Sequence, residues 1–138
     1  MPQWEFMTTP SSEPGLALYL TEIKVTQWAD LVRWYVDVLG LPLVLEDAPL
    51  QYALLEAGPG RLALKGGSAT GLARDAVRLV FEVADADAER DRLVGLGVTV
   101  SAPEESAEGY RAIRLSDPEG TPLTLFSWKP IAAEGDGA

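Results

Sequence analysis

The sequence contains no cysteine and no histidine among its 138 residues. Without cysteine, a disulfide framework, a thiolate zinc site and a cysteine nucleophile are excluded. Without histidine, a Ser-His-Asp triad, a histidine general base and a histidine-ligated metal are excluded. Acid–base chemistry in this chain would have to use Asp, Glu, Lys or Tyr.

Positive charge is also scarce, because the sequence has 11 Lys and Arg but 21 Asp and Glu, which gives a formal charge of -10. This imbalance argues against nucleic acid and against an anionic membrane as partners, since both bind through concentrated Lys and Arg. No apolar run approaches the roughly 20 residues of a spanning helix. No basic, apolar signal peptide begins the chain, so we expect a cytoplasmic protein. The excess of acidic residues favours a neutral or cationic small molecule as the ligand.

The length fits one domain, and a hydrophobic content of 47% is enough for a buried core. Residues 1–15 are rich in Pro, Ser and Thr and are predicted to form a flexible tail. Residues 130–138 have a similar tail-like composition. The single domain is therefore expected over residues 16–129.

An internal repeat organises this domain. Residues 16–25 read as a strand, and apolar residues at helical spacing predict a helix over 26–40, with Thr26 as N-cap and Gly40 at its end. Within that helix, Trp28 is expected in the core and Trp34 at its boundary. Turn residues then separate three strand candidates, PLVLED, QYALLEAG and RLALKGG.

The same order of elements returns in the second half. Residues 77–83 read as a strand, and Asp85 and Gly97 bracket a short helix. Three more strand candidates follow, VTVSAP, YRAIRLSD and TPLTLFSW. The glycine-rich stretch 66–71 is expected to join two modules, about 16–67 and 75–129. Two βαβββ modules predict an α+β fold with eight strands and two helices.

Three segments carry a family resemblance, VTQWADLVRWYVDVLGL, VRLVFEVADADAERDRLVGLGV and LSDPEGTPLTLFSW. They resemble the vicinal-oxygen-chelate superfamily of glyoxalases, bleomycin-resistance proteins and extradiol dioxygenases. The turn before the last strand is its most specific part. The resemblance implies a curved, cup-shaped, eight-stranded mixed sheet with helices on its convex side. It also implies a ligand in the cup and a homodimer.

The resemblance also allows the family's metal site to be checked. Metal-dependent members carry ligands on the first and last strands of each module, and these positions correspond here to Leu20, Ala63, Arg78 and Thr124. None of these is His, Glu, Asp or Gln, and a cationic Arg repels a divalent ion. We therefore expect no metal and no other cofactor.

Strand alternation predicts which side chains line the cup, because successive residues face opposite sides of a sheet. Apolar residues such as Ile23, Phe81 and Leu125 are assigned to the helix side. The predicted ligand-binding residues are Leu20, Glu22, Tyr52, Arg78, Tyr110, Arg114, Thr124, Phe126 and Trp128. Lys24 and Glu82 also fall on the cup side.

An ion pair between Arg78 and a carboxylate, with Glu22 as the partner, is predicted to take the place of the metal. The alternative is that such charges form purely structural pairs. Phe126 and Trp128 have a similar alternative, since they can fill a closed cup or face a dimer partner. The acidic cluster at Glu104, Glu105 and Glu108 is expected to be a solvated loop, with a rim for a cationic ligand as the alternative.

Two classes of function remain open. The first is a metal-free binding protein that sequesters an aromatic or cationic natural product or antibiotic, as in the bleomycin-resistance branch that the sequence resembles. The second is a diverged lyase, isomerase or dioxygenase-like enzyme with Glu22 or Glu82 as base. A regulatory or protein-interaction domain is a third possibility without a distinctive feature. The missing ligand residues favour the binding protein.

Overall fold

The computed structural model describes residues 15–67 and 77–129. The two halves have the predicted order of elements, one helical segment and four strands each. The first module consists of β1 (Thr21–Val25), α2 (Trp28–Arg33), η1 (Trp34–Val38), β2 (Leu43–Asp47), β3 (Tyr52–Ala57) and β4 (Gly60–Gly66). The second consists of β5 (Leu79–Glu82), α3 (Ala86–Gly95), β6 (Glu104–Glu105), β7 (Tyr110–Ser116) and β8 (Pro122–Trp128).

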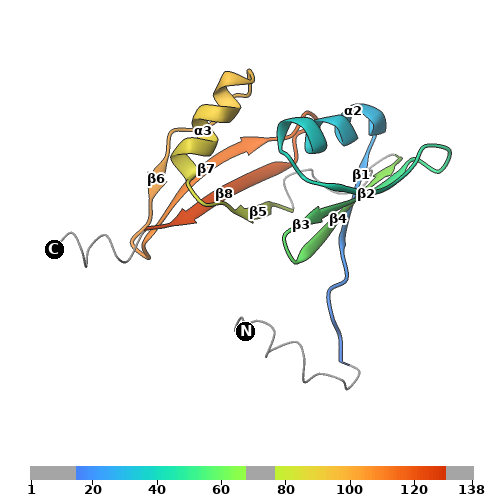
Figure 1. Cartoon of the computed structure of the whole chain (residues 1–138), viewed down its shortest axis with the longest axis horizontal. Helices are drawn as coiled ribbons and strands as arrows, with labels where there is room; N and C mark the ends of the chain where they lie inside the picture. The colour runs from blue at the N-terminus through green and yellow to red at the C-terminus, as the bar shows by residue number, and fades with distance from the viewer. Residues whose placement is uncertain (1–14, 68–76, 130–138) are drawn as a thin grey trace.

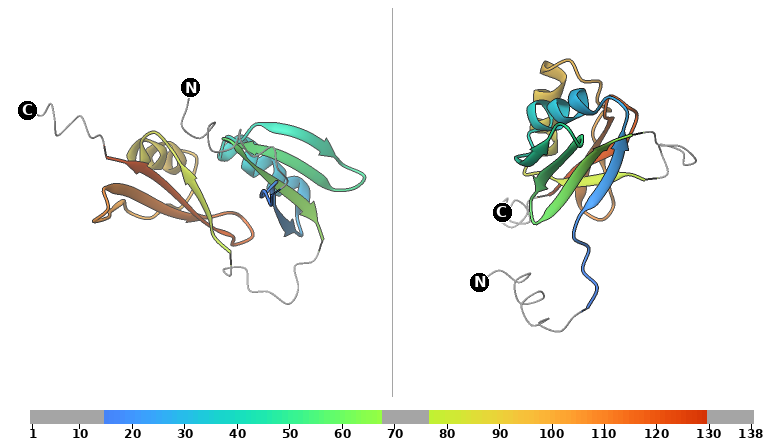
Figure 2. Two further views of the ribbon diagram at one scale, coloured as in Figure 1. Left: turned by 90° about the horizontal axis from the view of Figure 1, so that it is seen from below. Right: turned by 90° about the vertical axis from the view of Figure 1, so that its right-hand side faces the viewer.

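The eight strands form two separate four-stranded sheets, ordered β1-β4-β3-β2 and β5-β8-β7-β6. In each sheet the first strand pairs in parallel with the last, and the remaining pairs are antiparallel. The helices cover one side of the sheets and leave the opposite side open (Figures 1 and 2). The α+β two-module fold with eight strands is confirmed, and the eight strands are divided between two mixed sheets.

The first core lies between the helical segment of module 1 and its sheet. Trp28, Leu31, Val32 and Tyr35 are buried there against residues of β3 and β4. The Trp28 indole also donates a hydrogen bond to the Leu64 carbonyl at 3.1 Å, so its polar group is satisfied inside the core. The core assignment of Trp28 is confirmed.

The predicted single helix over 26–40 is shorter and changes its winding. The α-helical part ends at Arg33, and residues Trp34–Val38 form a π-helical turn. A π turn adds about one residue per turn, which rotates the side chains that follow. Tyr35 therefore stays in the first core, whereas Val38 packs against the second. Trp34 touches both cores, as its predicted boundary position implies.

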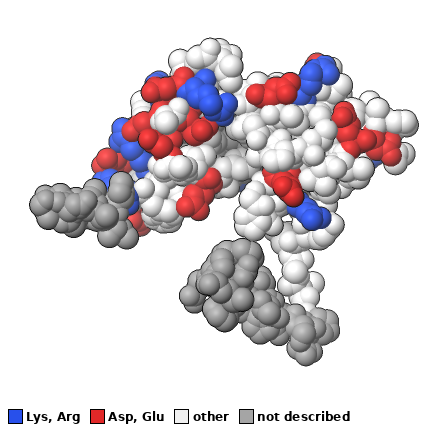
Figure 3. Space-filling view, in the orientation of Figure 1, with Lys and Arg blue, Asp and Glu red and all other residues white. Residues whose placement is uncertain are grey.

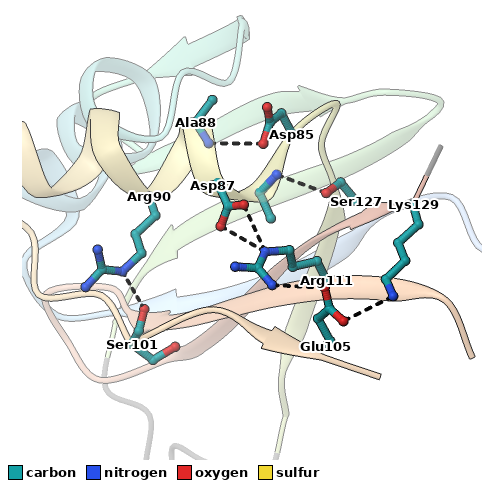
Figure 4. Close-up of polar contacts among 10 residues, drawn as sticks. Asp85, Asp87, Ala88, Arg90, Ser101, Glu105, Arg111, Ser127 and Lys129 are labelled. Atoms are coloured by element: carbon teal, nitrogen blue, oxygen red, sulfur yellow. Dashed lines mark hydrogen bonds and ion pairs between the residues drawn. The ribbon is translucent and has the colours of Figure 1, made fainter. Parts of the chain in front are cut away.

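The second core, under α3, contains fewer helical residues. Only Ala86 and Leu93 of this helix are buried in it, together with apolar residues of β7 and β8. Asp85 caps the helix as predicted, accepting a hydrogen bond from the Ala88 amide at 3.2 Å. Polar contacts to the sheet complete the attachment, including the hydrogen bond from the Ala86 amide to Ser127 at 2.9 Å (Figure 4).

Charged side chains surround this attachment (Figure 4). Arg111 pairs with Asp87 of α3 at 2.9 Å and with Glu105 of β6 at 3.2 Å. Lys129 also pairs with Glu105, at 3.1 Å. Because Glu105 lies in a strand and is ion-paired, the expectation of a solvated acidic loop is wrong at this residue. Glu104 is likewise in β6 and pairs with Arg114 at 2.7 Å.

The expectation of a strand over VTVSAP is also wrong. Residues 98–103 have no regular secondary structure, and the strand that follows is only two residues long. Side-chain and backbone bonds hold this segment instead, since Ser101 Oγ accepts from the Arg114 amide and the Ser101 carbonyl accepts from Arg90. Alternating apolar residues therefore predicted a strand in a segment that is held by individual hydrogen bonds instead.

A turn of module 2 joins the two modules. Buried Asp117 accepts a hydrogen bond from the Tyr35 hydroxyl at 2.6 Å. Glu119 accepts from the backbone amides of Thr26 and Gln27, at 3.0 and 2.6 Å, at the start of α2. The predicted Thr26 cap is wrong, because Gln27 is the N-cap residue and its side chain makes no capping bond. The carboxylate of Glu119 satisfies the exposed amides in its place.

The predicted tails, residues 1–15 and 130–138, lie outside the described residues except for Gly15. Most of the predicted joint, from residue 68 onward, does so too. No helix in the described ranges is long and apolar enough to cross a membrane.

Candidate functional site

The faces of the two sheets that carry no helix are the candidate binding surface, here called the open faces. Strand alternation assigned the helix side of both sheets correctly. Ile23, Phe81 and Leu125 all pack into the cores on the helix side. The residues between them in sequence therefore point to the open faces, as expected for a pleated strand.

Three aromatic side chains meet on the open face of module 2. Tyr110 of β7 lies beside Phe126 and Trp128 of β8, with ring centroids 5.4 to 5.8 Å apart. All three pairs meet edge to face, the geometry that favours the electrostatics of aromatic rings. Tyr110 and Phe126 are partly buried, whereas Trp128 is 55% exposed. We call these three residues the aromatic triad.

The register explains why the triad forms. Tyr110 is directly opposite Trp128 in the β7–β8 ladder, and Phe126 is two residues from Trp128 on the same face. Ala112 is opposite Phe126 and is too small to cover it. On the other flank, exposed Glu82 of β5 is in register with Phe126. A carboxylate therefore borders the aromatic surface.

Arg78 does not form the predicted ion pair. Its guanidinium donates to the Thr124 hydroxyl at 3.2 Å, on its own sheet. Among the described residues, no ion pair joins Arg78 to Glu22, because Glu22 belongs to the other sheet. The prediction assumed that the first strands of the two modules, β1 and β5, lie close together, but they belong to separate sheets.

Arg114 is also engaged by its neighbours. It lies on the open face opposite Thr124, and its guanidinium pairs with Glu104. Both side chains are more than half exposed, so the pair contributes little to stability. Arg78, Thr124 and Arg114 thus form a polar strip that lies next to the aromatic triad.

The predicted residues of module 1 lie on a different surface. Glu22 is exposed on its open face in register with buried Ala63, and Leu20 precedes this strand. Tyr52 is in register with Lys65, which is in turn in register with Lys24. The structure therefore brings together the predicted residues of module 2 and leaves Leu20, Glu22 and Tyr52 apart from them on the other sheet.

The positions that hold a metal in the related enzymes do not fit one here. Leu20 and Ala63 have hydrocarbon side chains, and Thr124 already accepts a hydrogen bond from cationic Arg78. A divalent cation would have to compete with that guanidinium. The described ranges also contain no group of three or more acidic side chains placed to hold a metal ion.

A cavity lies between the modules rather than over the triad. It has a volume of about 910 Å³ and is lined by the β3–β4 turn, by β5 and by part of α3. Arg78, Val80 and Glu82 border both this cavity and the open face. Because no ring of the triad lines it, we refer to it as the inter-module groove and treat it as a separate feature.

Sequence reasoning missed the ion pairs that Lys129 and Arg111 make with Glu105. A hydrogen bond from Lys129 and its positive charge, with a further effect of Arg111, hold the pKa of the Glu105 carboxyl below its ordinary value. Lys129 follows Trp128 directly, but its partner Glu105 is in register with Arg111, which pairs with Asp87 of α3, so this ion pair lies on the helix side of the sheet. The run of acids was visible in the sequence, but the cations that pair with it come from other strands.

Solved structures with this fold include proteins of different kinds. The integron cassette protein HFX_CASS4 from the Halifax Harbour metagenome is 19% identical with a TM-score of 0.70, covering 80% of this chain and 97% of its own. Lactoylglutathione lyase from Agrobacterium tumefaciens is 20% identical with a TM-score of 0.68, covering 83% and 96%. TnmS3, an antibiotic binding protein from Streptomyces sp. CB03234, is 20% identical with a TM-score of 0.69, covering 84% and 100%.

At these identities the likeness shows the fold alone, and no curated protein matches the sequence. The family model of the glyoxalase-like domain matches residues 21–126, which is most of the chain. The match begins at the first residue of β1 and ends within β8, so it spans nearly all of both modules. The chain therefore belongs to the glyoxalase-like domain family of the vicinal-oxygen-chelate superfamily.

Proposed function

We propose that this protein binds a small aromatic or cationic organic molecule, such as a natural product or antibiotic, without a metal ion. The aromatic triad is the observation that carries this proposal. Its exposed member, Trp128, offers a ring face to which a planar ligand can stack, while Tyr110 and Phe126 hold that ring in place. The antibiotic binding protein TnmS3, which shares the fold, gives a precedent for this class of ligand.

The charges near the triad favour a cationic ligand. Glu82 is exposed beside Phe126 and has no ion-pair partner among the described residues. Of the neighbouring cations on this face, Arg114 is already paired with Glu104, and Arg78 donates to the Thr124 hydroxyl. The chain as a whole carries a charge of -10, which attracts cations over a longer range.

The alternative, an enzyme with Glu22 or Glu82 as base, has weaker support. Both carboxylates are exposed on the open faces of the single chain, whereas a general base is usually held in an enclosed site next to its substrate. Glu82 is the better candidate of the two, because it lies beside the aromatic surface. Consumption of a bound compound that stops in Glu82→Gln would establish the enzyme.

The homodimer is part of the proposal. The open faces and their edges leave large apolar side chains exposed, among them Val80 at 58%, Leu45 at 50% and Trp128 at 55%. A second copy that covers part of these surfaces would convert an open aromatic face into an enclosed one, which is the form of most small-molecule sites.

Two planar dyes of opposite charge test the proposal. Cationic proflavine is expected to bind at least about tenfold more tightly than anionic anilinonaphthalene sulfonate, as measured by fluorescence anisotropy. Trp128→Ala is expected to abolish the binding of proflavine, whereas Val94→Ala on α3, a matched exposed apolar residue, leaves it unchanged. Equal affinity of Trp128→Ala and the unmodified protein would contradict the proposed site.

A further inference from the structure

We propose that the ligand of this protein is zwitterionic, with an aromatic, cationic part on the triad beside Glu82 and a carboxylate at its far end that pairs with Arg78. The inference rests on the proposed function and names the chemical class of the ligand more closely. Two features of the open face of module 2 support it, the surroundings of the Arg78 guanidinium and its distance from Glu82.

The Arg78 guanidinium has hydrogen-bond donors to spare. A guanidinium has five N–H donors, and within residues 15–67 and 77–129 that of Arg78 makes one hydrogen bond, to the neutral Thr124 hydroxyl at 3.2 Å, and no ion pair. Five other cations do pair with acids, namely Arg33, Arg92, Arg111, Arg114 and Lys129. In the view of Figure 3, basic side chains lie next to acidic ones. Arg78 therefore keeps a planar fork of donors that matches the two oxygens of a carboxylate.

Thr124 determines where this guanidinium lies. It belongs to β8, in register with Val80 of β5 on one side and Arg114 of β7 on the other. Because Arg78 donates to it, the guanidinium of Arg78 extends over β8 toward the middle of the sheet. Arg114 flanks Thr124 from the opposite side and pairs with Glu104 at 2.7 Å. The polar strip thus has two positive charges and one acidic partner, so it is a positively charged region in an acidic chain.

The carboxylates of the protein are placed elsewhere. The predicted partner of Arg78, Glu22, belongs to the other sheet, and Glu104 is engaged by Arg114. Glu82, on the same strand as Arg78, lies beside Phe126. In the part of the chain that the structure describes, the pairing of Arg78 with an acid is therefore left to a ligand.

The spacing along the strands defines the length of that ligand. Arg78 immediately precedes β5 and Glu82 ends it, four residues later, so both face the same side. Trp128 likewise follows Thr124 by four residues in β8. Each residue advances a strand by about 3.3 Å, so both distances are roughly 13 Å. An anionic group directly on the stacked ring would lie near Glu82 and be repelled, whereas one on an extended chain can reach Arg78.

Two matched acridines test the carboxylate. The compound 6-(acridin-9-ylamino)hexanoic acid and its methyl ester have the same cationic ring and the same chain, and differ only in the free carboxylate. The unmodified protein is expected to bind the acid about tenfold more tightly than the ester in fluorescence anisotropy at low salt, where exposed charges are least screened. Equal affinities for the two compounds would overturn the inference.

Arg78→Gln tests which residue causes the preference. The variant is expected to bind the acid only as tightly as the ester, and to bind the ester as the unmodified protein does, which shows that the fold and the triad are intact. Arg33→Gln is the matched control, because this exposed arginine of α2 pairs with Asp30 and its loss changes the net charge equally. A tenfold preference that survives in Arg78→Gln, or that disappears in Arg33→Gln as well, would contradict pairing at Arg78.

The same measurements separate this inference from the proposed function. If neither acridine binds the unmodified protein, the proposed function fails and the inference fails with it. If both bind with equal affinity and Trp128→Ala abolishes the binding of both, the zwitterionic ligand is overturned while the aromatic binding site stands.

Discussion

The Tyr35 hydroxyl donates a 2.6 Å hydrogen bond to the carboxylate of Asp117, and both residues are buried. Tyr35 belongs to the helical segment of module 1, whereas Asp117 begins the turn before the last strand of module 2. The other Asp117 oxygen accepts from the amides of Glu119 and Thr121 at 2.8 and 2.9 Å. One carboxylate thus shapes its own turn and fastens it to the other module.

Tyr35→Phe is expected to destabilise the fold by about 1–3 kcal/mol, because it leaves a buried carboxylate oxygen without its donor. Urea denaturation followed by circular dichroism measures the change. Tyr52→Phe, which removes a hydroxyl from the open face of module 1, is the matched control and is expected to cost less than about 0.5 kcal/mol. Equal effects of the two variants would contradict a special role for the buried hydrogen bond.

Glu119→Ala is expected to cost about 1–2 kcal/mol, since it removes the acceptor for the Thr26 and Gln27 amides and a negative charge at a helix N-terminus. Glu119→Gln is expected to retain part of this stability, because an amide oxygen still accepts but the charge is lost. Glu108→Ala, at an exposed acid in the β6–β7 connection, is the control. Thermal denaturation of the three variants ranks them, and a neutral Glu119→Ala would count against this capping contact.

Trp128→Ala is expected to separate binding from stability. The side chain is 55% exposed, so its removal is expected to cost about 1 kcal/mol or less in free energy of unfolding. Phe126→Ala is expected to cost more, because Phe126 is partly buried between Tyr110 and Trp128. Loss of ligand affinity in Trp128→Ala with nearly unchanged denaturation is the expected pattern. A large loss of stability would instead identify Trp128 as a packing residue.

Glu105 is expected to titrate below its ordinary pKa of 4.5 in the folded protein. Between the two pKa values the folded state binds fewer protons than the unfolded state, so this group stabilises the fold above the ordinary pKa. That contribution is lost as the pH falls through the lowered pKa. Carboxyl carbon NMR shifts follow the titration residue by residue.

Lys129→Gln provides the test of cause. It removes the principal source of the shift, so the pKa of Glu105 is expected to rise toward the ordinary value. Lys65→Gln is the control, because Lys65 donates to the Leu50 carbonyl and pairs with no carboxylate in the described ranges. An unchanged Glu105 titration in Lys129→Gln would exclude this ion pair as the cause.

Patterns among residues close together in the sequence predicted much of the fold. Alternation separated core residues such as Leu125 from open-face residues such as Phe126. In a strand with one buried side, every second residue faces the core, and these residues are apolar. The Asp85 cap was equally readable, since the capping residue and the amide it serves are three residues apart. The sequence also indicated the two modules through the repetition of their elements.

Contacts between residues far apart in the sequence were harder to predict. The start of α2 is capped by Glu119, 93 residues from Thr26, so a local search for an N-cap selected the wrong residue. The pairing of Arg78 with Glu22 failed for a related reason, since alternation gives the face of a residue but not the placement of two sheets. Tyr110, Phe126 and Trp128 were each assigned to the cup side and meet because they come from adjacent strands, whereas Tyr52, assigned to the same side, lies on the other sheet.

The two helical segments are fastened in different ways. Four large side chains anchor the first in an apolar core, but α3 buries only Ala86 and Leu93 and relies otherwise on exposed ion pairs and single hydrogen bonds. Exposed ion pairs weaken as salt rises. Amide protons of α3 will therefore exchange with solvent sooner than those of the first segment, and high salt will widen the difference. The half of the molecule that presents the aromatic triad is thus the half that opens more easily, and ligand binding there will slow its exchange.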